Sequence, residues 1–126
     1  MLFRSTVALR MKQHCDNAAK VVEYLQNHKA VERVIYSTEH NEEISSRAKK
    51  YLKNGNGALV GIELAGGIEA GKKFIEALKM FYHVANIGDA RSLAIHPATT
   101  THSQLNEDEL VASGVTPGYE IGRAHV

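Results

Sequence analysis

Helical spacing of apolar residues marks four segments of the chain. In the first, from Thr6 to Asn27, apolar residues recur every three or four positions, as on one face of a long amphipathic helix. The residues of this face are Met11, Cys15, Ala18, Val22 and Leu25. Residues 44–52 and 68–80 repeat the pattern. A fourth helix is predicted after Asn106, which can form a capping box with Glu109.

Short runs rich in β-branched and aromatic residues separate these segments and predict strands. They cover residues 31–37, 58–64, 83–87, 92–96 and 116–121. The order is therefore helix, strand, helix, strand, helix, two strands, helix, strand. This order predicts a two-layer α/β fold with helices packed on a sheet.

Composition describes an ordinary globular protein with no electrostatic reason to bind nucleic acid or a membrane. The chain has 126 residues, of which 44% are hydrophobic and 23% charged, and a net charge of +1. No segment approaches the ~20 apolar residues of a membrane span, and Arg4 and Arg10 interrupt the opening residues, unlike a secretory signal. Cys15 is the single cysteine, so no internal disulfide is possible and we expect a cytoplasmic protein.

Three features could carry chemistry, and each has a stronger structural explanation. His96 and His102 are separated by a proline and lack a third ligand, so we predict no metal site. Cys15 lies on the apolar helix face, where cysteine behaves as a small hydrophobe. The glycines of "ELAGGIEAGKK" lack the spacing of a phosphate-binding loop. The residues alone reveal no complete catalytic set, and they leave the function open.

A resemblance narrows these possibilities. The stretch "ANIGDARSLAIHPATTTHSQL" (residues 85–105) closely resembles the pyridoxal phosphate (PLP) enzymes of cysteine and methionine metabolism, the cystathionine γ-synthase group. "ELVASGVTPGY" and "ELAGGIEAGKKF" are most similar to the O-acetylhomoserine sulfhydrylase branch. The resemblance implies a truncated small C-terminal domain, residues 1–119, of a fold-type-I PLP transferase. Its helices would pack on a mostly antiparallel or mixed sheet.

The resemblance also implies a function for the whole protein. Members of this branch replace the acetoxy group of O-acetylhomoserine with sulfide or a thiol, in methionine biosynthesis, and are usually homotetramers. Their Schiff-base lysine lies in the large domain, so we expect no cofactor-binding and no catalytic residue in this chain. By itself the chain would then be inactive.

The small domain of the family contributes to recognition of the substrate carboxylate. The resemblance assigns this role here to Asn86, to the backbone at Ile87 and to Thr101. An amide N–H is a suitable donor for a carboxylate oxygen. In the family the main contact is an arginine, which can bond a carboxylate through two N–H groups.

The sequence departs from the family pattern where that arginine is expected. After Gly118 and Tyr119 the family has an apolar residue and then the arginine, whereas this chain has Glu120 and Ile121. The ending "EIGRAHV" back-translates as GAG ATC GGA AGA GCA CAC GTC, which contains the start of a common short-read sequencing adapter. Our hypothesis is that residues 120–126 are a non-family tail. Without the family's last strand and helix, we expect an unpaired sheet edge and exposed apolar surface.

Two alternatives to this interpretation stay open. The chain could be a free-standing module that binds an amino acid or a protein without catalysis. It could also derive from a cystathionine γ-synthase or methionine γ-lyase relative, because these branches share the same motifs.

Overall fold

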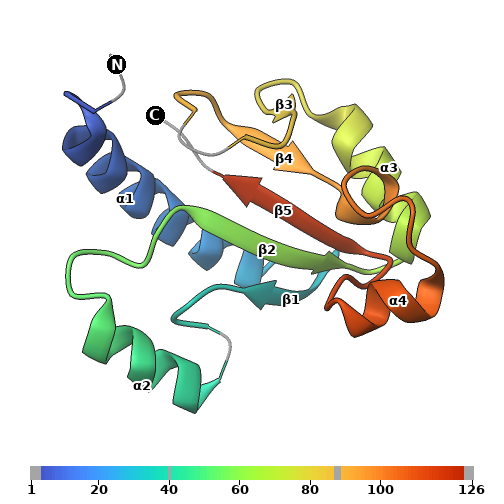
Figure 1. Ribbon diagram of the computed structural model, residues 1–126, viewed down its shortest axis with the longest axis horizontal. Coiled ribbons are helices and arrows are strands. Elements are labelled where there is room, and N and C mark those ends of the chain that lie inside the picture. Colours follow the sequence, from blue (N-terminus) through green and yellow to red (C-terminus); the bar gives the residue numbers. More distant parts are fainter. Residues whose placement is uncertain (1–3, 40, 87–88, 124–126) are drawn as a thin grey trace.

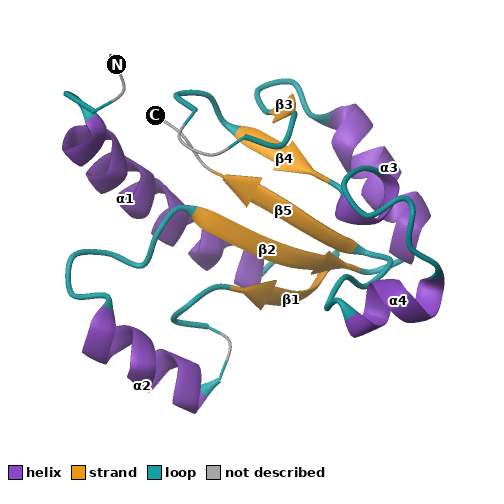
Figure 2. Ribbon diagram, viewed as in Figure 1, coloured by secondary structure: helices purple, strands orange, loops and turns teal. Residues whose placement is uncertain are grey.

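The computed structural model describes residues 4–39, 41–86 and 89–123. They form helices around a five-stranded sheet (Figures 1 and 2). The helices are α1 (Val7–Gln26), α2 (Glu42–Tyr51), α3 (Gly67–Ala77) and α4 (Glu107–Ala112), with a short 3-10 helix at Pro97–Thr99. The strands are β1 (Val31–Ile35), β2 (Leu59–Leu64), β3 (Tyr82–His83), β4 (Leu93–Ile95) and β5 (Tyr119–Arg123). None of the described helices is long and apolar enough to cross a membrane.

The sheet is mixed and has the last strand at its centre. Its order is β1-β2-β5-β4-β3, in which β5 is antiparallel to both β2 and β4, and β3 is parallel to β4. Ile121 is paired with Gly61 on one side and with Ile95 on the other. The predicted α/β fold with a mixed sheet is therefore confirmed.

The main core lies between one face of the sheet and helices α1 and α3. Ala18 and Val22 of α1 contact Val60 and Ile62 of β2, and Phe74 of α3 packs against the same cluster. In Figure 1, α1 passes behind β2, and α2 stands apart from the sheet. Met11 was predicted on the buried face of the first helix, but it is 42% exposed. The packed part of α1 therefore begins after Met11.

A smaller core lies on the opposite face, where α4 covers one end of the sheet. Leu110 of α4 packs with Ala98 and Val115, and Tyr119 of β5 lies against them. The predicted capping box is present: Asn106 accepts a hydrogen bond from the Glu109 backbone, and the Glu109 side chain accepts one from the Asn106 backbone. It fixes the start of α4 beside Tyr119.

One prediction about the strands was wrong. The strand expected over residues 83–87 ends at His83, because the Val84 N–H turns back to the carbonyl of Tyr82 (3.0 Å) instead of continuing the pairing. Residues 84–86 consequently leave the sheet as a loop. Residues 120–123 belong to β5, which lies at the centre of the sheet, and the edges of the sheet are β1 and β3. The hypothesis that residues 120–126 are a non-family tail stays a prediction.

Close packing at the start of β5 predicts a difference between two glycines of this segment. A Cβ atom at residue 118 would lie 2.5 Å from the Leu64 carbonyl oxygen, which is backbone and cannot rotate away. We expect Gly118→Ala to lower the free energy of unfolding by about 2–3 kcal/mol. At Gly122 the nearest atoms would be 3.9 Å away, so Gly122→Ala should be neutral or stabilise by up to about 1 kcal/mol. Urea denaturation of both variants checks this, and equal losses would contradict it.

Candidate functional site

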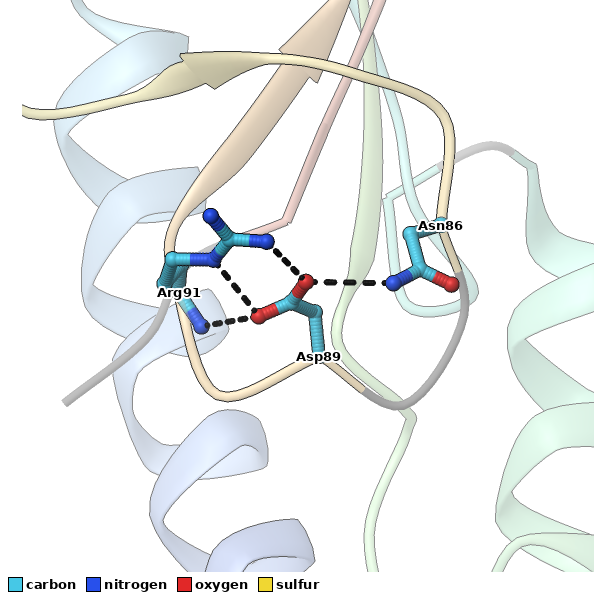
Figure 3. Close-up of polar contacts among 3 residues, drawn as sticks. All are labelled: Asn86, Asp89 and Arg91. Atoms are coloured by element: carbon cyan, nitrogen blue, oxygen red, sulfur yellow. Dashed lines mark hydrogen bonds and ion pairs between the residues drawn. The ribbon is translucent and has the colours of Figure 1, made fainter.

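Asn86 lies in the loop that leaves the sheet after β3. Its carboxamide nitrogen donates a hydrogen bond to Asp89 Oδ2 (3.1 Å). Because a carboxylate only accepts hydrogen bonds, this contact requires the nitrogen, rather than the oxygen, to face Asp89. Figure 3 shows the Asn86 oxygen directed away from that carboxylate. The nitrogen keeps a second N–H, which could donate a hydrogen bond to a ligand carboxylate.

Arg91 holds the Asp89 carboxylate from three positions. Its backbone N–H and Nε donate to Oδ1 (2.9 and 3.0 Å), and Nη2 donates to Oδ2 (2.8 Å) (Figure 3). These hydrogen bonds, the side-chain ones first, hold the pKa of the Asp89 carboxyl well below its usual range. Asp89 is therefore ionised at neutral pH, and the guanidinium compensates its charge. Our sequence interpretation had assigned no role to this pair, although "GDAR" places both charges in one loop.

A hollow of about 230 Å³ lies beside Asn86, and its lining is mostly apolar. It is lined by Leu59, Val84, Ala85, Asn86, Leu93, Ala94, Ile95, Ile121 and Gly122. Ile121 occupies the position at which the sequence comparison expected the family's arginine. The structure thus brings Asn86 and position 121 to one hollow, although they are far apart in the sequence.

The other two residues expected at this site are placed differently. Thr101 is exposed, and its hydroxyl is bonded to Nδ1 of the neighbouring His102 (2.9 Å). It is not among the residues that line the hollow beside Asn86. Ile87 lies outside the described residues. The geometry therefore groups Asn86 with Asp89, Arg91 and position 121.

His96 is buried near Gly71 of α3, and both of its ring nitrogens have partners. Nε2 lies 2.9 Å from the Pro117 carbonyl and Nδ1 lies 2.8 Å from Thr99 Oγ1. A carbonyl cannot donate, so Nε2 carries a proton and donates to the Pro117 carbonyl. His96 thereby joins β4 to the turn before β5. The described residues contain no group of three or more His, Cys, Asp or Glu placed to hold a metal ion.

Glu120 has the most unusual environment of the described acidic residues. Its side chain faces the α1 and α3 side of the sheet and is 1% exposed, and neither carboxyl oxygen has a hydrogen-bond partner. It borders an apolar cavity of about 250 Å³, with Val60, Ile62 and Phe74 among its walls. Burial raises the pKa of Glu120 to about 8. No signal in the sequence alone indicated this burial, because it follows from the register that pairs Glu120 with the buried Ile62.

Comparison with known families matches residues 4–119 to the Cys/Met metabolism PLP-dependent enzymes. The chain belongs to this family. It is 51% identical over 115 residues to O-acetyl-L-homoserine sulfhydrylase of Leptospira meyeri, covering 90% of this chain and 26% of that protein. It is 42% identical over 113 residues to L-methionine gamma-lyase of Fusobacterium nucleatum subsp. polymorphum, covering 90% of this chain and 28% of that protein. The chain thus spans little more than a quarter of these relatives.

A solved structure of the family has the same fold as this chain. The O-acetylhomoserine (thiol)-lyase of Campylobacter jejuni superposes with a TM-score of 0.85 at 36% identity. The superposition covers 95% of this chain and 28% of that protein, which carries a pyridoxyl-lysine monophosphate residue. The match to the family therefore holds in both sequence and shape.

The described residues do not fit the cofactor of the family. A PLP enzyme needs a lysine amine that forms a Schiff base within its site. All nine lysines of this chain are exposed, and none lines the hollow beside Asn86. Lys12 and Lys72 are engaged in ion pairs within their own helices. We therefore assign no lysine to the cofactor.

The burial of Glu120 predicts that the chain becomes less stable as the pH rises. Between about pH 4.5, the ordinary pKa, and about pH 8, the folded chain holds a proton that the unfolded chain has released. The free energy of unfolding should therefore fall by about 1.4 kcal/mol per pH unit across this window. The stabilisation is complete below the window, and the loss ends above it.

Denaturation at a series of pH values measures this slope. Glu120→Val should remove it and raise stability at neutral pH, because it replaces an unpaired acid with an apolar side chain. Glu76→Gln, which alters an exposed carboxylate of α3, is the control and should keep the slope. If the wild type and Glu120→Val show the same pH dependence, Glu120 is not buried as described.

Proposed function

We propose that this chain is the small-domain part of a PLP-dependent enzyme that replaces the acetoxy group of O-acetylhomoserine with sulfide or a thiol. The supporting observation is the hollow that Asn86 shares with position 121, together with the sulfhydrylases among the similar proteins. In this proposal the chain binds the substrate carboxylate, and the cofactor chemistry belongs to another part of the protein.

The polar groups around Asn86, at the border of the hollow, support recognition of an anion. Asn86 offers an amide N–H, and the negative charge of Asp89 is compensated by Arg91 at 2.8 Å. A ligand carboxylate would therefore meet a donor without meeting an uncompensated like charge. We also propose that Thr101 and the backbone at Ile87 contribute to the substrate carboxylate site in the whole protein, as the family resemblance implies.

A second reaction of the same family is a real alternative. The methionine gamma-lyase relative is 42% identical to this chain over a similar span. The described residues of the hollow are mostly apolar and give no group that distinguishes a replacement reaction from an elimination. The sulfhydrylase proposal therefore rests on the higher identity of 51%.

We also propose that residues 120–126 are not the family's own sequence. The burial of Glu120 without a partner supports this, because that position faces an apolar layer. Ile121 supports it from the other face, since it lies where a carboxylate-binding residue would complete the hollow. The pair thus provides an acid where the fold needs an apolar side chain, and an apolar side chain where the proposed site needs a cation.

The whole protein is proposed to work in the cytoplasm as a homotetramer, as the resemblance implies. Some large apolar side chains are exposed in this chain, as expected if they contact other parts or other subunits of the whole protein. Leu9 of α1 is 75% exposed and Met80 is 78% exposed.

Replacing two residues should create the carboxylate site in this chain. In Glu120→Val/Ile121→Arg, the valine fills the apolar layer and the arginine enters the hollow beside Asn86. We expect this variant to bind O-acetyl-L-homoserine about tenfold more tightly than the matched control Glu120→Val/Ile121→Leu, because a guanidinium bonds a carboxylate through two charge-assisted hydrogen bonds. NMR titration of the backbone amides near residues 84–86 and 121 provides the affinities.

The methyl ester of the same ligand tests whether the carboxylate is the group recognised. Both variants should bind the ester equally weakly. If the arginine variant gains nothing for the free acid, or gains as much for the ester, the hollow is not a carboxylate site.

A further inference from the structure

The orientation of the Asn86 carboxamide matters for the proposed site and requires an explanation. Asn86 is exposed, and the two faces of an amide have nearly the same shape, so its packing alone would allow either orientation. In the observed orientation one N–H is bonded to Asp89, and the second N–H is held in a fixed direction in which an anion could accept from it. In the structure the contact that selects this orientation is the one to Asp89 Oδ2.

Asp89 can select the orientation because it is itself held on both oxygens. Oδ1 accepts from the backbone N–H and Nε of Arg91, and Oδ2 accepts from Nη2 of Arg91 and from Asn86. The Asp89 side chain is 11% exposed, whereas that of Arg91 is 54% exposed. The carboxylate is therefore the shielded centre of this group, with Asn86 and Arg91 on its two sides (Figure 3).

The sheet fixes the position of this group. The Arg91 guanidinium lies over the ring of Tyr82 in β3, 4.8 Å from its centre. The Tyr82 N–H donates to the carbonyl of Ser92 (2.9 Å), which joins the two ends of the loop. Arg91 is thus tied to β3 by its ring contact and to Asp89 by its hydrogen bonds.

We propose that Asp89 is a positioning residue: it holds the Asn86 carboxamide so that the second N–H of its nitrogen is available to a ligand carboxylate, while Arg91 compensates its charge. The inference rests on the proposed function, in which Asn86 contacts that carboxylate. Removing Asp89 would then weaken binding through Asn86 although Asp89 itself does not touch the ligand.

A simpler role for the pair would be to close the loop. In that case Asp89 and Arg91 would hold the turn between them, and the state of the Asp89 carboxyl would not affect the Asn86 amide protons. The two roles therefore predict different responses of the Asn86 amide protons to protonation or removal of the Asp89 carboxylate.

The side-chain amide protons of Asn86 in the ligand-free chain decide between the roles. In a 15N-edited NMR spectrum, assigned with Asn86→Ala, we expect the Asn86 side-chain signals to move as Asp89 is protonated, with a midpoint below the usual carboxyl range. In Asp89→Ala the bonded amide proton should exchange with water about tenfold faster, because it loses a hydrogen bond to a charged acceptor. Asp89→Asn keeps an acceptor oxygen and should restore part of the protection.

Glu69→Gln is the matched control, because Glu69 is also paired with a cation at 2.8 Å but lies on α3. It should leave the Asn86 signals unchanged. Dispersed methyl signals of Val22 and Ile62 would verify that each variant is folded. Asn86 signals that respond neither to acid nor to Asp89→Ala in a folded chain would overturn the inference.

A ligand arm keeps this inference separate from the proposed function. In the Glu120→Val/Ile121→Arg background, adding Asp89→Ala should weaken O-acetyl-L-homoserine binding about tenfold, and adding Glu69→Gln should not. A background variant that binds no free acid would count against the proposed function. An Asp89→Ala change without effect on a ligand that does bind would count against the positioning role.

Discussion

The pairing of β5 with both β2 and β4 is the interaction on which this domain depends. β5 joins the antiparallel β1–β2 pair to the short β4 and β3 strands, so it connects the two parts of the sheet. Successive side chains of β5 point to opposite faces of the sheet, so each residue of this strand belongs to one face or the other. Glu120 is placed against α1 and α3, and Ile121 is placed toward the loop of Asn86. Core stability and the proposed site are therefore determined by neighbouring residues of one strand.

These two faces have opposite chemical requirements. The inner face is lined by apolar side chains of α1, β2 and α3, where an unpaired carboxyl is unfavourable. On the outer face the Asp89–Arg91 pair compensates its own charge, and in the proposed site an amide N–H of Asn86 is left for an anion. A strand with an apolar residue at 120 and a cation at 121 would satisfy both faces. In this chain Glu120 places an acid on the inner face and Ile121 places an apolar side chain on the outer face, so neither requirement is met.

Much of the fold could be predicted from the sequence, because its signals are local. The spacing of Ala18 and Val22, the Asn106 capping box and the β-branched run of β2 each define an element within a few residues. The early end of β3 could not be predicted, since it depends on a backbone hydrogen bond from Val84 to Tyr82 that competes with strand pairing. Likewise the central place of β5 depends on partners far away in the sequence.

The proposed site was only partly predictable for the same reason. The family resemblance predicted a role for Asn86, whereas the proposed roles of Asp89 and Arg91 follow from distances that no motif specifies. The burial of Glu120 needed the register of β5 against β2, which places it beside Ile62. Conversely, Thr101 was expected near substrate, and in this structure its hydroxyl is bonded to His102. Its role remains a prediction for the whole protein.

The central claim is the proposal that residues 120–126 are not the family's own sequence. Sequencing the gene directly from its source DNA, through the region that encodes Gly118 and onward, tests this claim most directly. The account predicts an apolar residue at position 120, an arginine at position 121 and a longer reading frame with a Schiff-base lysine upstream. A natural frame that reads Glu-Ile-Gly-Arg-Ala-His-Val and then stops would contradict it.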